Sequence, residues 1–269
     1  MRNISAPLHK NMSKFNKILS PAASLGKARL FNRHLPLFVS WELTNRCNLK
    51  CRYCDVWKLN SEELPTDTVL SMVDELKNLG TKFISFTGGE PLLRKDIDEI
   101  LSHCKTNGLY ASLNSNGFEL KDKPQTVKKF DFVIMSLDGQ EAIHDYIRGD
   151  GSYRRVLEAA EMLKENKMRL NFAVTLTKFN LDQIGFLMNK ANEYNATITF
   201  QPASLNVLYA DRDNAIRHSE DENKKAIQEI MDYKSTRKGR VITNSFSVLR
   251  HLYDWPNKRM VRCASGQIS

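Results

Sequence analysis

Long apolar runs are missing from this sequence. Nothing in its 269 residues approaches the ~20 consecutive apolar residues that a transmembrane helix needs. The N-terminal stretch also lacks the apolar core of a secretory signal peptide, so we expect a cytoplasmic protein. Because 41% of the residues are hydrophobic, the chain can still bury a sizeable core, as one large domain or as one domain with an appendage.

Acidic residues are absent from the first 41 positions, which carry seven basic ones: Arg2, Lys10, Lys14, Lys17, Lys27, Arg29 and Arg33. Removing these seven from the 40 Lys and Arg leaves 33 against 31 Asp and Glu, so the rest of the chain is nearly neutral. A basic leader can contact anionic lipid, nucleic acid or an acidic partner. It can also be a solvated helix that packs on the body through Phe15, Ile18 and Leu19. We favour the helix, and expect no nucleic-acid partner, because no basic stripe interleaved with aromatic residues follows.

Cysteine is scarce and unevenly placed. Of five cysteines, three stand within the eight residues 47–54, in the stretch CNLKCRYC. This distribution does not resemble the disulfide framework of a secreted protein. In a reducing compartment, such a group more often binds metal or carries out redox chemistry. Cys104 lies in a helical pattern over residues 93–107 and is interpreted as a small buried hydrophobic residue.

Six short β-rich runs alternate with helical patterns, which implies parallel strands joined by right-handed crossovers. Apolar residues repeat at helical spacing over residues 69–76 and 181–191, and Gly80 provides a stop signal after the first of these. The predicted strands are residues 38–43, 83–87, 109–115, 132–137, 170–176 and 196–201.

The chemically unusual motifs all fall where a predicted strand ends. The cysteine loop follows the first strand, GGEP the second, NSNG the third, LDG the fourth and Gln201-Pro202 the sixth. Barrels of alternating strands and helices assemble their active sites at this end of the strands. The sequence therefore predicts an α/β fold with a partial (β/α)6 TIM-like barrel.

We assign residues 1–37 to the basic leader, 38–203 to the barrel and 204–269 to a helical extension. Ser219 and Glu222 form a capping-box pattern at the start of a helix that runs to about Tyr233. A second helix is predicted over residues 246–253. We expect this extension to close part of the barrel mouth.

Three clustered cysteines leave several kinds of site open. A structural zinc site needs four ligands, so one more would have to come from a distant residue. Residues 51–54 could form a thioredoxin-like C-x-x-C motif, but Cys47 would then have no part in it. A [4Fe–4S] cluster normally takes four thiolates, one per iron, so three thiolates would leave one iron open to an outside ligand. Soft thiolates suit iron–sulfur chemistry.

The sequence resembles the radical S-adenosylmethionine (SAM) superfamily. CNLKCRYC matches its C-x3-C-x2-C signature, including the aromatic residue before the last cysteine. The resemblance continues through TGGEPLL (87–93), SLNSNG (112–117), MSLDG (135–139) and HDYIRG (144–149), and covers about residues 38–203.

The resemblance implies that Cys47, Cys51 and Cys54 bind three irons of a [4Fe–4S] cluster and that the amino and carboxylate groups of SAM chelate the fourth. An electron from the reduced cluster would cleave SAM into methionine and a 5′-deoxyadenosyl radical, which abstracts a hydrogen atom from the substrate. The low potential that this requires implies a flavodoxin or ferredoxin as electron donor.

Further positions that match the family would bind SAM. The lack of side chains at Gly88 and Gly89 would let a backbone edge approach the methionyl group, and Glu90 would accept from its ammonium. Otherwise this segment is an ordinary turn stiffened by Pro91. Tyr53 would lie near the adenine, or else only pack.

The strand-end polar residues have similar alternatives. Ser112, Asn114 and Asn116 would bind ribose or carboxylate, or would cap loops. Arg148 would be the partner of the SAM carboxylate, and Asp138 lies in the matching LDG segment. Both could instead form a surface ion pair.

The fifth cysteine stands near the C-terminus, in the segment Cys263–Gly266. This C-x-x-G pattern resembles the start of the SPASM or twitch extension, which holds an auxiliary iron–sulfur cluster. We therefore expect the sequence to be a truncated form of a longer protein. A solitary thiol in a frayed tail is the alternative.

The substrate is the least determined feature. Relatives with auxiliary clusters often modify peptides or proteins, which is the function we favour. Other relatives act on cofactor or lipid precursors. A non-catalytic zinc or iron–sulfur binding protein would use the same thiols.

Overall fold

The computed structural model describes residues 35–59, 62–203 and 218–254. Six parallel strands form one sheet in chain order, from β1 at one edge to β6 at the other. Each predicted strand agrees with the observed bounds to within one residue, and the predicted partial barrel is confirmed. The strands are β1 Phe38–Thr44, β2 Phe83–Gly88, β3 Tyr110–Ser115, β4 Phe132–Ser136, β5 Leu170–Leu176 and β6 Thr197–Pro202.

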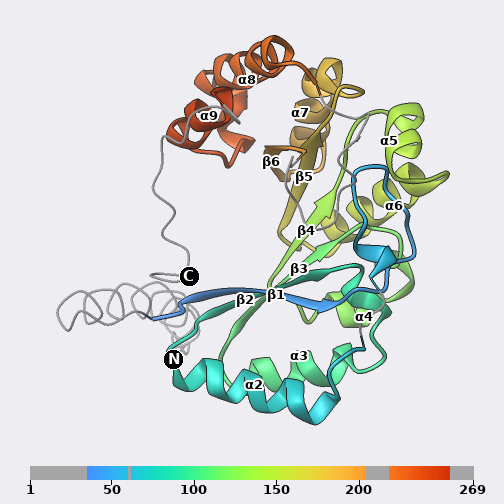
Figure 1. Ribbon diagram of the computed structural model, residues 1–269, viewed down its shortest axis with the longest axis vertical. Coiled ribbons are helices and arrows are strands. Elements are labelled where there is room, and N and C mark those ends of the chain that lie inside the picture. The colour runs from blue at the N-terminus through green and yellow to red at the C-terminus, as the bar shows by residue number, and fades with distance from the viewer. Residues whose placement is uncertain (1–34, 60–61, 204–217, 255–269) are drawn as a thin grey trace, which may run out of the picture.

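The helices between the strands lie along the outer side of the curved sheet, and two further helices follow the last strand (Figure 1). The helices are α2 Thr66–Asn78, α3 Ile97–Thr106, α4 Pro124–Val127, α5 Glu141–Arg148, α6 Ser152–Glu165, α7 Ile184–Glu193, α8 Glu220–Ser235 and α9 Phe246–Tyr253. Short 3-10 turns are η1 Val56–Lys58, η2 Pro91–Leu93, η3 Leu120–Asp122, η4 Leu181–Gln183 and η5 Lys238–Val241. None of the described helices combines the length and the apolar composition that crossing a membrane requires.

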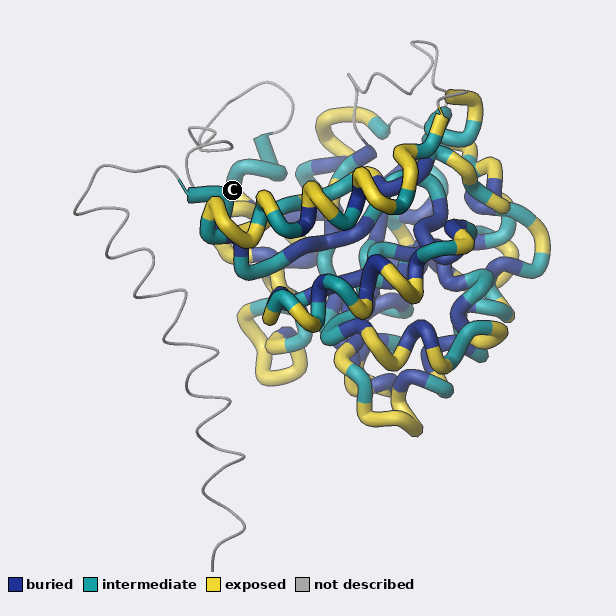
Figure 2. Tube along the Cα trace, turned by 90° about the horizontal axis from the view of Figure 1, so that it is seen from below, coloured by how far each residue is buried: buried dark blue, intermediate teal, exposed yellow. Residues whose placement is uncertain are grey.

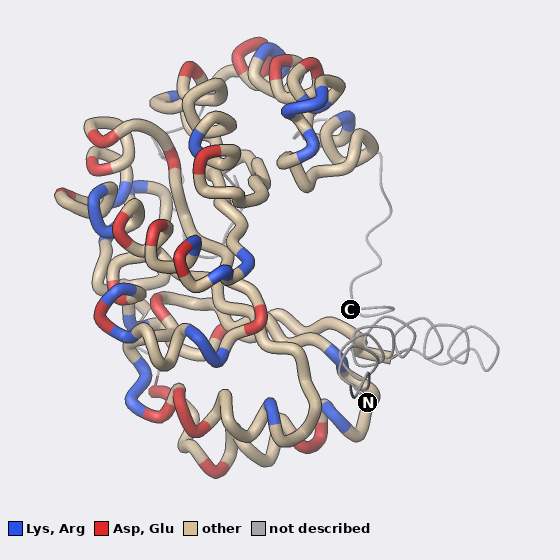
Figure 3. Tube along the Cα trace, turned by 180° about the vertical axis from the view of Figure 1, so that it is seen from behind, with Lys and Arg blue, Asp and Glu red and all other residues tan. Residues whose placement is uncertain are grey.

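The core lies between the sheet and these helices. Strands that are covered on both faces are expected to be apolar almost throughout, and β5 buries six of its seven residues. Phe86, Phe172 and Phe200 are among the largest fully buried side chains. In Figure 2 the buried segments run through the middle of the molecule, and in Figure 3 most charged residues lie on helices and loops. The sheet is therefore a buried, largely apolar layer, and it supports the residues at the strand ends.

Two helical features differ from the sequence expectation. The predicted helix over residues 93–107 begins later, at Ile97, because Arg94 takes an extended conformation after the η2 turn. The connection between β4 and β5 holds two helices, α5 and α6, where a helical pattern had been expected without stated bounds. Cys104 is fully buried in α3, as predicted.

The helical extension adds to the edge of the sheet. The Ser219–Glu222 capping box is confirmed at the start of α8. Beyond α8, Ile242 forms a parallel bridge with Ile198 of β6, and the Asn244 side chain exchanges two 2.8 Å hydrogen bonds with the backbone of Phe200. These contacts place Ile242 and Asn244 along the outer edge of β6, and our expectation that the extension closes part of the barrel mouth stays a prediction.

Several expectations concern residues outside the described part of the chain. They include most of the basic leader with Phe15, Ile18 and Leu19, the first part of the extension, and Cys263. The domain boundaries at residues 37 and 203 and the auxiliary-cluster segment therefore stay predictions.

Candidate functional site

The cysteine loop follows β1 and is held from two sides. On one side, the Gly89 amide donates to the Thr44 carbonyl at 2.7 Å and the Glu90 amide donates to the Arg46 carbonyl at 2.8 Å. On the other side, the Arg52 amide donates to the carbonyl of Ile147 in α5 at 2.9 Å. Backbone bonds thus fix the loop between the ends of β2 and α5.

Gly88 and Gly89 are required by this packing. A Cβ atom on Gly88 would lie 2.2 Å from the Thr44 carbonyl oxygen, and one on Gly89 would lie 2.1 Å from the Arg46 carbonyl oxygen. Gly88 also has a φ of +116°, which disfavours any other residue. We expected these side chains to be missing so that a ligand could approach. The structure shows that the cysteine loop itself occupies the space.

The three clustered thiols line one cavity of about 200 Å³. Cys47, Cys51 and Cys54 are all partly buried. Burial raises the pKa of the Cys51 thiol to about 11 and also raises the pKa of Cys47. The other lining residues are Leu49, Tyr53, Val56, Trp57, Thr87, Gly88, Gly89, Asn114, Ser115, Asn116, Ser136, Arg148, Ala173, Thr175 and Gln201.

Nitrogen donors stand beside two of the thiols. Arg148 Nη1 lies 3.9 Å from Cys51 Sγ, and Asn116 Nδ2 lies 3.7 Å from Cys47 Sγ. The guanidinium charge opposes the effect of burial on the pKa of Cys51. Both donors would stabilise the thiolate form, which is the form that binds metal.

This donor set fits an iron–sulfur cluster. Within residues 35–59, 62–203 and 218–254, no three His, Cys, Asp or Glu side chains form a site for a single metal ion. The thiolates of a cubane each bind a different iron, so they need not converge on one point. Three soft sulfur donors around one cavity, two of them beside N–H groups, are compatible with this arrangement.

A buried ion pair lies against the cysteine loop. Asp138 is fully buried, Arg148 is 6% exposed, and Arg148 Nε lies 2.6 Å from Asp138 Oδ2. The alternative that they form a surface pair is therefore wrong. Tyr53 OH lies 3.3 Å from the same carboxylate oxygen and also accepts from Arg148 Nη2. Asp138 itself does not line the cavity, whereas Arg148 and Tyr53 do.

Glu90 lies behind the cavity, fully buried. Its carboxylate accepts from the amides of Leu92 and Asn116 at 3.2 and 2.9 Å and from Ser115 Oγ at 2.9 Å. Despite these donors, burial raises the pKa of Glu90 to about 7. The side chain joins the GGEP turn to the end of β3, and its assignment to the SAM ammonium stays a prediction.

The strand-end residues predicted from the third motif divide into two groups. Asn114 and Asn116 line the cavity. Ser112 lies deeper, where its hydroxyl donates to Ser85 Oγ at 2.9 Å. Asn114 donates to the same Ser85 oxygen at 2.7 Å.

Sequence reasoning missed four polar lining residues or gave them no role. Ser136 is the last residue of β4, and Thr87, Thr175 and Gln201 each stand one residue before the end of β2, β5 and β6. Gln201 was noted only as part of an unusual strand end. The usable signal was position: each stands at the carboxyl end of a strand, where barrel sites form.

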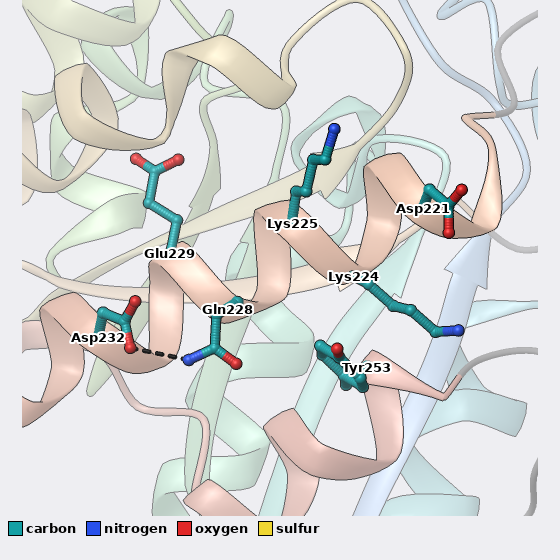
Figure 4. Close-up of a pocket in the computed structure, with 7 residues that line it drawn as sticks. All are labelled: Asp221, Lys224, Lys225, Gln228, Glu229, Asp232 and Tyr253. Atoms are coloured by element: carbon teal, nitrogen blue, oxygen red, sulfur yellow. Dashed lines mark hydrogen bonds between the residues drawn. The ribbon is translucent and has the colours of Figure 1, made fainter.

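A larger hollow of about 580 Å³ lies elsewhere, on the outer side of α8 beside Tyr253 (Figure 4). Its lining consists of charged and amide side chains of α8 together with that tyrosine. Lys224 pairs with Glu220 at 2.6 Å, and Gln228 donates to Asp232 at 2.8 Å. This hollow holds no soft metal ligand, so the cysteine cavity is the better candidate site.

The model of the radical SAM superfamily matches residues 41–191. The chain belongs to the radical SAM superfamily. The family implies a [4Fe–4S] cluster and SAM as cofactors, in agreement with the three-thiol site.

Curated relatives of this superfamily member have different named activities. The AdoMet-dependent heme synthase of Methanosarcina barkeri is 33% identical over 171 residues, which are 60% of this chain and 48% of the relative. The mycofactocin maturase MftC of Mycolicibacterium smegmatis is 30% identical over 172 residues, 61% of this chain and 43% of the relative. The chain thus spans less than half the length of these two relatives.

Solved structures share the fold. Streptococcus suis SuiB bound to its precursor peptide SuiA superposes with a TM-score of 0.71 and 18% identity, covering 93% of this chain and 57% of SuiB. The SuiB complex with SAM gives a TM-score of 0.70 and 20% identity, covering 85% of this chain and 55% of SuiB. The enzyme anSMEcpe with bound AdoMet gives 0.61 and 23%, covering 73% and 59% of the two chains.

Substitution of Gly89 by Ala tests the fit between the GGEP turn and the cysteine loop. The new methyl group would meet the Arg46 carbonyl, so we expect a loss of roughly 2 kcal/mol or more in unfolding free energy. We also expect poor iron incorporation. Gly185→Ala is the matched control, because nothing lies within 4 Å of its added Cβ in α7. Urea unfolding and iron content measure both effects, and a G89A protein as stable as G185A would contradict the packing argument.

The buried Glu90 predicts a pH dependence of stability. Because its pKa is raised from 4.5 to about 7, its protonated form favours folding, and this contribution is lost as the pH rises through 7. Between about pH 5 and about pH 8, the wild type should therefore lose up to about 3 kcal/mol relative to Glu90→Gln. The measurement is the slope of unfolding free energy against pH. Parallel slopes for the two proteins would show that Glu90 has an ordinary pKa.

Proposed function

We propose that this chain is the catalytic barrel of a radical SAM enzyme in which Cys47, Cys51 and Cys54 bind three irons of the [4Fe–4S] cluster. The observation that carries the proposal is the set of three thiols on one loop, facing a cavity that is also lined by residues from the carboxyl ends of β2 to β6. SAM would complete the coordination of the fourth iron. When bound, cluster and SAM supply reductive cleavage of the sulfonium and a 5′-deoxyadenosyl radical that removes hydrogen from a substrate.

The residues of the chain hold and orient these groups. Gly88, Gly89, Asn114 and Asn116 line the cavity and are proposed to contact the methionyl group and ribose of SAM. Tyr53 is proposed to lie near the adenine. These residues lie at or next to the ends of buried strands, and such positions are held more precisely than positions on free loops.

The remaining predicted residues lie at or behind this lining. Arg148 is at the cavity and is proposed to face the SAM carboxylate. Asp138 and Glu90 are buried behind it, where each carboxylate holds a neighbouring segment. Ser112 supports Asn114 through their shared contact with Ser85.

A peptide or protein is the substrate class we favour. The support is the maturase name of one curated relative and the precursor peptide bound to the structural neighbour SuiB. A flavodoxin or ferredoxin is the proposed electron donor, and the cytoplasm the proposed location. In a longer form of the protein, Cys263 would be a ligand of an auxiliary cluster.

A tetrapyrrole is the second candidate substrate. Two curated relatives from Methanosarcina barkeri are named AdoMet-dependent heme synthase and Fe-coproporphyrin III synthase, the latter 29% identical over 170 residues, 61% of this chain and 43% of the relative. This candidate belongs to the cofactor-precursor class, which the sequence analysis gave as the alternative to a peptide.

Replacement of one cysteine tests the cluster assignment. After anaerobic reconstitution the wild type should hold about four irons and, once reduced with dithionite, should release 5′-deoxyadenosine from SAM. Cys51→Ala should abolish both the brown colour and the product. Cys104→Ala is the control, because this thiol is buried in α3 away from the cavity. A colourless wild-type protein that binds zinc would instead support the non-catalytic alternative.

Product analysis distinguishes the substrate classes. The reconstituted chain is incubated with SAM and either a short peptide translated from an open reading frame beside its gene or Fe-coproporphyrin III. We expect the peptide to raise 5′-deoxyadenosine above the substrate-free level and to change in mass. Stimulation by the tetrapyrrole alone would reject the peptide assignment and leave the radical chemistry intact.

A further inference from the structure

Arg148 is fixed by three separate contacts. It is the last residue of α5, and its Nε donates to Asp138, its Nη2 to Tyr53 OH, and its Nη1 points to Cys51 Sγ at 3.9 Å. The guanidinium therefore bridges the end of β4 and two residues of the cysteine loop. A rotation toward any other group would break the bond to a buried carboxylate, which is costly.

Asp138 is in turn held so that it cannot follow such a rotation. Its Oδ1 accepts from the Thr175 amide at 2.9 Å, and its own amide donates to His144 Nδ1 at 3.1 Å. His144 is fully buried, and burial lowers its pKa to about 4, so it stays neutral and keeps Nδ1 as an acceptor. The result is a preorganised positive charge next to one thiol.

Asn116 is the second fixed donor, beside another thiol. Its Oδ1 accepts from the Phe118 amide at 2.9 Å, which turns its Nδ2 toward Asn48 Oδ1 at 2.8 Å and Cys47 Sγ at 3.7 Å. The amide orientation is thus set by the chain and does not depend on a bound ligand.

We propose that Arg148, positioned by Asp138, and Asn116 raise the reduction potential of the cluster by donating to the Cys51 and Cys47 thiolates. The inference rests on the proposed function, because it needs the cluster on these thiols. Reduction adds one electron to the cluster from a low-potential one-electron donor, and no proton moves. A nearby buried cation and N–H donors stabilise the added negative charge, and hydrogen bonds to sulfur are known to set such potentials.

The role differs from that of a SAM-carboxylate partner. A carboxylate partner would act only when SAM is bound. The contacts described above exist in the chain alone, and Arg148 Nη1 points to the sulfur of Cys51. The effect should therefore be present in the cluster-loaded protein before SAM is added.

The test is a redox titration of the reconstituted protein without SAM, followed by electron paramagnetic resonance of the reduced cluster. In Arg148→Gln, the equilibrium constant for one-electron reduction should fall about tenfold, which corresponds to a potential about 59 mV more negative. Arg154→Gln is the matched control, because Arg154 makes the same charge change from an exposed position on α6. We expect R154Q to match the wild type.

Further variants decide the cases in which R148Q is hard to load. Arg148→Lys keeps the charge and should recover part of the lost potential. Asn116→Ala removes only a neutral donor and should lower the reduction constant by a smaller factor, about threefold. Iron content is measured for each protein, so potentials are compared only between equally loaded clusters.

The outcomes separate the inference from the proposed function. A fully loaded R148Q or N116A protein with wild-type potential overturns the inference, even if R148Q binds SAM weakly. A wild type that takes up no cubane rejects the proposed function instead, and the inference with it. Shifted potentials in a protein that does not cleave SAM would support the inference and reject the catalytic assignment.

Discussion

The contact on which the site depends is the backbone pairing between the GGEP turn and the start of the cysteine loop. Gly89 and Glu90 donate to the carbonyls of Thr44 and Arg46, and the two glycines leave no room for a side chain between the segments. β1 and β2 are parallel neighbours whose register shifts between Glu42 and Thr44, and this pairing continues their ladder beyond that shift. The loop that carries the three thiols is thus attached directly to a buried parallel sheet, which holds it in place.

The cysteine loop is also held by residues that follow β4. Asp138 follows β4, and Arg148 ends the short helix α5, which also binds the cysteine loop through the Ile147 carbonyl. One loop is therefore held by elements about 100 residues later in the chain. These contacts fix the shape of the loop within the chain itself, and a reactive site needs such preorganised residues.

The sequence predicted the strands well and identified the three clustered cysteines, because both depend on local patterns. Alternating strand and helix signals give the sheet order, and three cysteines in eight residues lie together in any fold. The buried state of Glu90 and the Asp138–Arg148 pair could not be predicted in this way. Each depends on contacts between segments 10 to 37 residues apart, which no spacing in the sequence reveals. The same is true of the glycines, whose motif was identified while the reason for it was not.

The buried pair of Asp138 and Arg148 is best explained by the thiols beside it. A buried ion pair adds little net stability, since an apolar pair of similar volume often does as well or better. Three fixed contacts from one guanidinium, one of them to a cysteine sulfur, are more than anchoring a loop needs. A buried positive charge stabilises a negative charge that forms beside it, and the effect is strong where little water screens the two. An iron–sulfur cluster on these partly buried thiols would take up its electron beside this pair, so the desolvation that weakens the pair as a structural element strengthens it as an electrostatic one.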